Sequence, residues 1–128
     1  MAFRDQRAHR KLAMRLVLAL IQPTKLKAVQ DALNKIGVER MTVCDALGFG
    51  QQRGAKAGAP ASGRPALLRK VALEIAVNED FLDKTIETIT KTARTTAQGA
   101  IGDGKIFVLP VEEVVRLSDT IRGPEAVS

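Results

Sequence analysis

The chain has 128 residues, a length that suits one domain with a single modest hydrophobic core. Hydrophobic residues make up 45% of it and charged residues 27%, as in an ordinary globular protein, and the longest apolar run, at residues 16–21, is far too short to span a bilayer. The formal net charge of +6 indicates an anionic partner, but four phenylalanines are the only aromatic residues, so a nucleotide or an acidic protein surface suits the composition better than base stacking on nucleic acid.

Redox and metal chemistry have few candidate residues in this sequence. The single cysteine, Cys44, excludes an internal disulfide and fits a reducing cytoplasm. It falls in a strand-like run, so we expect a thiol packed in the core. One cysteine and one histidine, His9, cannot form a zinc site, and the polar N-terminus lacks the apolar stretch of a secretory signal. These features predict a cytoplasmic protein with no metal site built from the protein alone.

The N-terminal part of the chain predicts an extension, a strand and a helix. Residues 1–13 are expected to form a basic extension, and the apolar residues at 15–22 indicate a buried strand that Pro23 ends. A helix follows, because apolar residues recur at steps of three and four along one face: Leu26, Val29, Leu33 and Ile36. Gly37 favours the left-handed backbone that ends such a helix.

A second strand and a long loop are expected next. The strand covers about residues 38–47, and the Gly48-Phe49-Gly50 triplet is expected to break it. Small residues, Gly and Pro dominate residues 51–66, and no apolar period survives there, which indicates a long loop. Loops of this length in compact domains are often functional. Its charged residues are all positive, so an acidic target is expected.

The strand and helix pattern then repeats. Residues 67–77 predict a third strand, and Asn78 is expected to cap the helix that follows it. The apolar face of that helix consists of Leu82, Ile86, Ile89 and Ala93. A loop at residues 95–104 leads to a fourth strand at about residues 105–109.

The predicted order of elements, β-α-β-β-α-β, indicates an α+β fold of the ferredoxin-like split β-α-β type. Such a fold has one antiparallel sheet with both helices on one face. The first and third strands are near-continuous apolar runs, which need cover on both faces, so we expect an oligomer that buries the open face. After the fourth strand, residues 114–117 are a candidate for another short strand, and residues 119–128 are expected to form a loose C-terminal tail.

The segment Ile101-Gly102-Asp103-Gly104-Lys105 stands directly before the fourth strand. Its glycines let the backbone approach a ligand closely and its lysine adds a positive charge, so the segment is a candidate phosphate cradle. It is not a Walker loop, which requires a longer glycine spacing and a Ser or Thr after the lysine. Taken alone, it is better explained as a plain turn before a strand.

Two groups of residues resemble the signatures of one protein family. Met41-Thr42-Val43 followed by Gly48-Phe49-Gly50-Gln51-Gln52-Arg53-Gly54 is similar to the strand-two segment of the P-II family of nitrogen and carbon signalling proteins. Ala93-Arg94-Thr95 and residues 101–108 are similar to the second signature of that family. The motifs occur in the right order with near-correct spacing, and the resemblance covers residues 14–118, the whole predicted domain.

The resemblance implies a homotrimer with nucleotide sites in the clefts between subunits. It implies that ATP and ADP compete there, that 2-oxoglutarate joins ATP and Mg²⁺, and that the protein is a regulator and not an enzyme. Residues 51–66 match the family's T-loop, which contacts a target protein such as a membrane transporter or a metabolic enzyme. Residues 95–104 match its B-loop, and the chain from residue 114 onward matches its C-loop. A cytoplasmic protein recruited to the membrane by a transporter fits this reading, and no nucleic acid is expected as a partner.

Individual site residues also follow from the resemblance. The residues that match the nucleotide site are Thr42, Gly48 and Gly50 for adenine and ribose, and Gly102, Asp103, Gly104, Lys105 and Arg116 for the phosphates. Gln52 matches the glutamine that helps to bind Mg²⁺ and 2-oxoglutarate, and Lys70 matches the lysine that pairs with a 2-oxoglutarate carboxylate. The residues expected to contact the target are Arg53, Lys56, Ser62 and Arg64. No catalytic residue is expected.

Four departures from the family pattern surround the expected site. Gln51, Ala100 and Ser118 stand where the family has basic residues, and the loop at residues 95–104 is longer than usual. Each charged hydrogen bond contributes roughly 1.5–3 kcal/mol, so three lost cations should weaken the triphosphate most, and we expect ADP or AMP to bind as well as ATP or better. The chain contains no tyrosine, which excludes the family's modification of a T-loop tyrosine and leaves Ser62 as the only hydroxyl there.

Two other classes of function stay open on the residues alone. A small-molecule enzyme is one, although no histidine, reactive cysteine or carboxylate pair lies near the glycine turn and only Asp103 could orient a water. A ferredoxin-like RNA-binding domain is the other, because this fold serves many functions. Fast turnover of a small substrate would favour the first, and a steeply salt-dependent affinity for RNA without adenine-nucleotide binding would favour the second.

Overall fold

The computed structural model describes residues 13–50 and 66–127, so the predicted N-terminal extension and nearly all of the 51–66 loop lie outside the described residues. The elements in chain order are β1 (Met14–Ile21), the 3₁₀ turn η1 (Pro23–Lys25), α2 (Leu26–Lys35), β2 (Thr42–Gly50), β3 (Ala66–Asn78), α3 (Glu79–Ala93), β4 (Gly104–Val111) and the 3₁₀ turn η2 (Gly123–Val127). No helix in these two ranges is long and apolar enough to cross a membrane.

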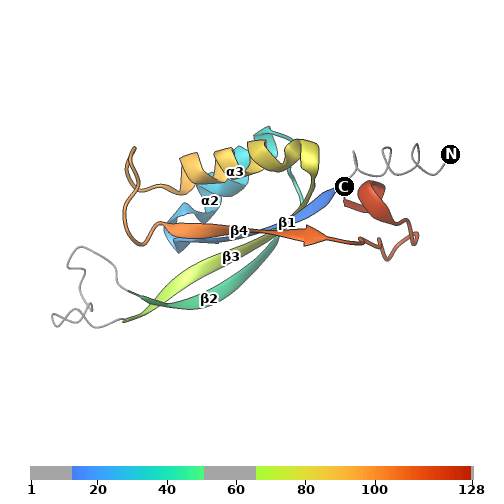
Figure 1. The fold of residues 1–128 in the computed structure, drawn as a ribbon. Helices are drawn as coiled ribbons and strands as arrows, with labels where there is room; N and C mark the ends of the chain where they lie inside the picture. Colours follow the sequence, from blue (N-terminus) through green and yellow to red (C-terminus); the bar gives the residue numbers. More distant parts are fainter. Residues whose placement is uncertain (1–12, 51–65, 128) are drawn as a thin grey trace.

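The four strands form one antiparallel sheet in the order β2-β3-β1-β4, and α2 and α3 lie together on one of its faces (Figure 1). β1 is central and pairs along its whole length with both neighbours. At its end, Ile21 lies opposite Val71 of β3 and Gly104 of β4. The predicted ferredoxin-like α+β fold is therefore confirmed.

The hydrophobic core lies between the sheet and the two helices. Val17 of β1 and Leu73 and Ile75 of β3 point toward the helices, and each is fully buried. Leu33 of α2 and Ile89 of α3 pack against them from the helix layer. A side-chain period of two in the strands and of three to four in the helices brings these residues into one layer.

The sheet face opposite the helices carries a second apolar stripe. Residues directly opposite each other on antiparallel strands share a face, and Leu16 lies opposite Leu109 while Leu18 lies opposite Phe107. Phe107 is 46% exposed and Leu109 is 42% exposed, because both helices lie on the other face (Figure 1). An exposed apolar surface of this kind is typical of a contact with another protein chain.

β2 begins later than predicted. Residues 38–41 precede the strand, because the chain is still bonded to the end of α2 when it leaves the helix. Gly37 turns the chain with a φ of +88°, and the Val38 amide then donates to the Leu33 carbonyl at 3.0 Å. Val38 is thereby buried beneath the end of the helix, and the chain enters the sheet only at Thr42.

Two further predictions about β2 are wrong. The glycines at residues 48–50 do not break the strand, because its pairing with β3 continues until Gly50 lies opposite Ala66. Cys44 is exposed and not packed in the core. It lies opposite Ala72, and since Leu73 points toward the helices, Ala72 and Cys44 point away from them.

The chain after β4 is folded, contrary to the prediction of a loose tail. The expected short strand is reduced to one bridge between Val115 and Arg122, and η2 follows with Ala126 9% exposed. The prediction that the Asn78 side chain caps α3 is also wrong. Asn78 stands at the cap position, but its amide nitrogen donates to the Pro124 carbonyl at 3.3 Å, which ties η2 to the end of β3.

Replacing Leu33 by Ala should lower the free energy of unfolding by about 2–5 kcal/mol, because it leaves a cavity at a fully buried position. Leu117→Ala is the matched control, since Leu117 is 93% exposed, and it should change the free energy by less than about 0.5 kcal/mol. Urea denaturation at one protomer concentration measures both variants. Equal losses would contradict the assigned core.

Candidate functional site

The loop between α3 and β4 is organised around the side chain of Asp103. The carboxylate accepts hydrogen bonds from the Thr95 backbone N–H (3.2 Å), the Thr95 hydroxyl (2.8 Å) and the Ala100 N–H (2.8 Å). Gly99 and Gly102 have φ values of +81° and +97°, a backbone region that side chains disfavour. The short carboxylate and the two glycines therefore fold the long loop back on itself.

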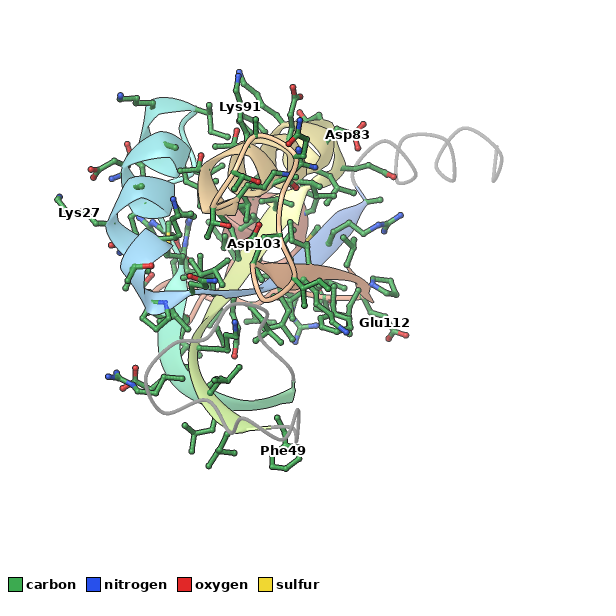
Figure 2. The ribbon with its side chains drawn as sticks, turned by 90° about the vertical axis from the view of Figure 1, so that its left-hand side faces the viewer. Lys27, Phe49, Asp83, Lys91, Asp103 and Glu112 are labelled. Atoms are coloured by element: carbon green, nitrogen blue, oxygen red, sulfur yellow. The ribbon has the colours of Figure 1, made fainter. Side chains whose placement is uncertain are left out.

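Asp103 is charged in this setting. Burial raises its pKa, but the hydrogen bonds from Ala100 and Thr95 and the charge of Lys25 together hold the pKa below its ordinary value. The carboxylate is therefore ionised at neutral pH and acts as an acceptor for the loop. It lies at the end of the molecule that faces the viewer in Figure 2.

Gly104 is required where the loop enters the sheet. Its φ is +124°, and a Cβ at this position would overlap the backbone carbonyl of Leu20. No other residue fits this close contact without moving β4 away from β1. The contact fixes the backbone directly before Lys105, which follows on the exposed surface of β4.

The Gly102 carbonyl anchors the other side of the loop to the sheet. It accepts a hydrogen bond from Lys70 Nζ at 2.6 Å and another from Gln22 Nε2 at 3.1 Å. A Cβ at Gly48 would lie 3.4 Å from Lys70 Cγ, so Gly48 gives this lysine room. The predicted site residues Gly48, Lys70 and Gly102 are thus neighbours. Gln22 was missed by the sequence prediction, and its only signal was a polar residue at the end of an apolar strand.

A cavity of about 600 Å³ opens between α3, the loop and β4. Its apolar wall includes Ile86 and Ile89, and its polar rim includes Arg94, Asp103 and Lys105. The cavity therefore combines an apolar wall, backbone from the glycine turn and two cations. Among the described residues, no group of three His, Cys, Asp or Glu side chains could hold a metal ion.

Other predicted site residues lie far from this cavity within one chain. Thr42 is on the edge strand β2, separated from β4 by β3 and β1, or about 14 Å at ordinary strand spacing. Gly50 ends β2 directly after Phe49, and Phe49 lies far from Asp103 in Figure 2. Arg116 follows the opposite end of β4, about 23 Å along the strand from Gly104. Five further predicted residues lie outside the described ranges: Gln52, Arg53, Lys56, Ser62 and Arg64.

Comparison with known proteins identifies the family. The family model described as nitrogen regulatory protein P-II matches residues 14–120. The chain belongs to the P-II family.

Among P-II relatives, nitrogen regulatory protein GlnK1 of Methanosarcina mazei is 46% identical over 117 residues, which cover 91% of this chain and 99% of that protein. Nitrogen regulatory protein P-II of Azospirillum brasilense is 40% identical over 89% of this chain and 100% of its own length. Arabidopsis thaliana PII bound to citrate superposes with a TM-score of 0.72 at 37% identity, over 90% of both chains. The B. subtilis GlnK–ATP complex superposes with a TM-score of 0.73 at 27% identity, over 89% of this chain and 97% of that one.

Replacing Gly104 by Ala should lower the free energy of unfolding by about 1–3 kcal/mol or more, because the new methyl group meets the Leu20 carbonyl at a disfavoured φ. Gly48→Ala is the control, since its Cβ would make only a 3.4 Å contact with a flexible lysine. We expect a loss below about 1 kcal/mol there. Chemical denaturation that ranks Gly48→Ala as the worse variant would contradict the assigned contact.

The Ala100 amide should report the charge state of Asp103 in a pH titration followed by NMR. A lowered pKa means that the order contributed by the carboxylate is present above the ordinary pKa and is lost only as the pH falls through the folded value. The midpoint at Ala100 should therefore lie below the ordinary 3.8, and the transition should vanish in Asp103→Asn. A midpoint above 3.8 would contradict the hydrogen-bonded carboxylate.

Proposed function

We propose that the chain is a non-catalytic regulator that binds ATP and ADP in the clefts of a homotrimer and signals to a target protein through residues 51–66. The observation that carries the proposal is the turn at residues 99–105, in which three glycines with positive φ lead directly into Lys105. Its relatives are named nitrogen regulatory proteins, and one similar structure is an ATP complex. The names support a regulatory role, and the ATP complex supports a nucleotide as the ligand.

Phosphate suits the chemistry of this turn. Successive N–H groups in such turns form concave sites that bind anions. The side chain of Lys105 is exposed and makes no hydrogen bond or ion pair within the described part of the chain, so its charge is available to a phosphate. The Asp103 carboxylate is directed to Thr95 and Ala100, which limits its repulsion of an anion.

A site shared between subunits accounts for the separation of the predicted residues. Thr42 and Arg116 cannot reach Lys105 within one chain, but the corresponding residues of a neighbouring copy could complete the site. The apolar stripe with Phe107 and Leu109 offers the surface for such a neighbour. The resemblance to the P-II family makes a trimer the expected assembly.

Mg²⁺ and 2-oxoglutarate are proposed as further ligands, together with the predicted preference for ADP or AMP. The proposal rests on Gln52, outside the described residues, and on Lys70. The Lys70 ammonium donates to the Gly102 carbonyl at 2.6 Å, so a 2-oxoglutarate carboxylate must share or replace that contact. The citrate-bound Arabidopsis relative supports a carboxylate ligand on this fold.

Signalling is proposed to run from the nucleotide to residues 51–66 and from there to an acidic surface on a membrane transporter or a metabolic enzyme. The motivating features are the positive charges of Arg53, Lys56 and Arg64. A nucleotide changes the contact only if it binds the alternative loop shapes with unequal affinity. We place the protein in the cytoplasm, with recruitment to the membrane when the target is a transporter.

Calorimetric titration of ATP and ADP tests the proposal. Lys105→Ala should weaken binding by about 10- to 150-fold, because it removes a charged hydrogen bond to phosphate. Lys27→Ala is the control, since Lys27 is a surface residue of α2 paired with Asp31 at 3.5 Å, and its affinity should match the parent. No binding of any adenine nucleotide would contradict the function, and a clear lead of ATP over ADP would contradict the predicted preference.

A further inference from the structure

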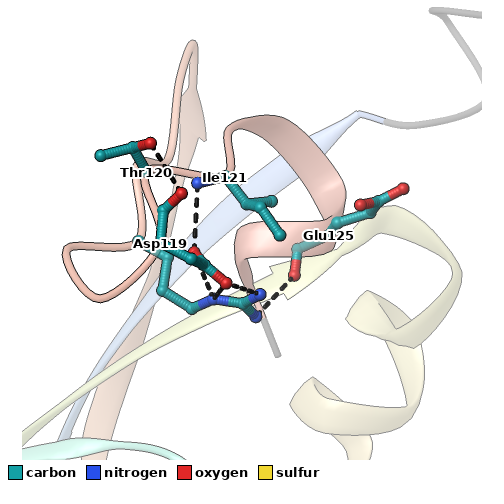
Figure 3. Close-up of polar contacts among 5 residues, drawn as sticks. Asp119, Thr120, Ile121 and Glu125 are labelled. Carbon is teal, nitrogen blue, oxygen red and sulfur yellow. Dashed lines mark hydrogen bonds and ion pairs between the residues drawn. The ribbon is translucent and has the colours of Figure 1, made fainter.

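The Arg116 guanidinium is held by a carboxylate of its own chain. Arg116 Nε lies 3.0 Å from Asp119 Oδ1 and 3.1 Å from Oδ2, and Arg116 Nη2 lies 2.6 Å from Oδ2 (Figure 3). Arg116 Nη1 also donates to the Glu125 carbonyl at 3.4 Å. A guanidinium and a carboxylate joined by several parallel hydrogen bonds form one of the stronger ion pairs in proteins.

The backbone around the pair keeps Asp119 in place. The Ile121 N–H donates to Asp119 Oδ1 at 3.1 Å, and Thr120 takes a φ of +59°, rare for a residue other than glycine. The Thr120 amide donates to the Arg116 carbonyl (2.8 Å), and the Arg116 amide donates to the Ile121 carbonyl (2.9 Å). The tight turn at residues 116–121 therefore presents the carboxylate to Arg116 without help from any ligand.

The pair stays ionised and only partly screened by solvent. The Arg116 side chain is 31% exposed and that of Asp119 is 41% exposed. The hydrogen bond from Arg116 comes first among the causes that lower the pKa of Asp119, and the same bond raises the pKa of Arg116. A phosphate that approaches Arg116 meets this neutralised pair, and it must displace the carboxylate or tolerate its charge.

We propose that Asp119 is an internal competitor for Arg116 that lowers the affinity of the nucleotide site and sets its preference among ATP, ADP and AMP. The inference rests on the proposed function, in which Arg116 contacts phosphates. The attraction between Arg116 and the phosphates, which Asp119 cancels, grows with the charge of the ligand, so the competition weakens ATP most and AMP least. The contact between Arg116 and Asp119 is therefore a second reason, besides the three replaced cations, to expect ADP or AMP to bind as well as ATP.

Asp119→Asn tests the inference, because an asparagine keeps an acceptor for the Ile121 N–H but loses the charge. We expect ATP to bind roughly 2- to 5-fold tighter and AMP to gain less than about 2-fold, with ADP between them. Glu113→Gln is the matched control. It removes one negative charge from the same segment, where Glu113 pairs with Arg122 at 3.6 Å, and it should leave all three affinities near the parent values.

The double variant Arg116→Ala with Asp119→Asn separates competition from a general charge effect. If Asp119 acts through Arg116, adding Asp119→Asn to Arg116→Ala should give no further gain for any nucleotide. Two outcomes would overturn the inference and leave the proposed function intact. In the first, the parent binds nucleotides and Asp119→Asn changes the three affinities equally or not at all. In the second, the gain survives in the Arg116→Ala background. Absence of nucleotide binding in every variant would overturn the proposed function together with the inference.

Discussion

The contact between Gly104 and the backbone of Leu20 sets the geometry on which the candidate site depends. β1 is paired on both sides, so the backbone of Gly104 rests against a strand that is itself held along both edges. From that fixed point the loop is anchored twice more, by the Gly102 carbonyl with Lys70 and Gln22 and by the Asp103 carboxylate within the loop. The backbone before Lys105 is thus arranged before any anion arrives, which lowers the ordering cost of binding.

The charged residues of the proposed site are separated at the two ends of β4. Lys105 lies at the start of the strand beside the anchored loop, and Arg116 lies beyond its end, where Asp119 binds it. A nucleotide that uses both cations therefore needs two copies of the chain. The proposed function also requires the ligand to compete with two internal contacts, the Lys70 bond to Gly102 and the Arg116 bond to Asp119.

Local patterns predicted the fold well and long-range contacts poorly. The apolar period of α2 and the glycine turn before Lys105 are read from neighbouring residues, and both predictions located real features. The extension of β2 through Gly50 depends on its partner strand, and the order of the tail depends on the bond from Asn78 to Pro124, 46 residues apart. Gln22 was missed for the same reason, because its partner Gly102 is 80 residues away. The family resemblance named Arg116, but only the folded turn brings Asp119 against it.

Mixed assemblies of two defective chains test most directly whether the site is shared between subunits. Lys105→Ala and Arg116→Ala chains should each bind ATP much more weakly than the unmodified chain, and joint unfolding and refolding should restore full affinity at about one site in four by random pairing. Titration of the mixture against each separately refolded variant measures this restoration. Recovered ATP sites are expected in the mixture alone. Two results would contradict a site shared between subunits. One is a mixture that co-assembles but binds no more ATP than either variant alone, and the other is an unmodified chain that binds ATP as a monomer.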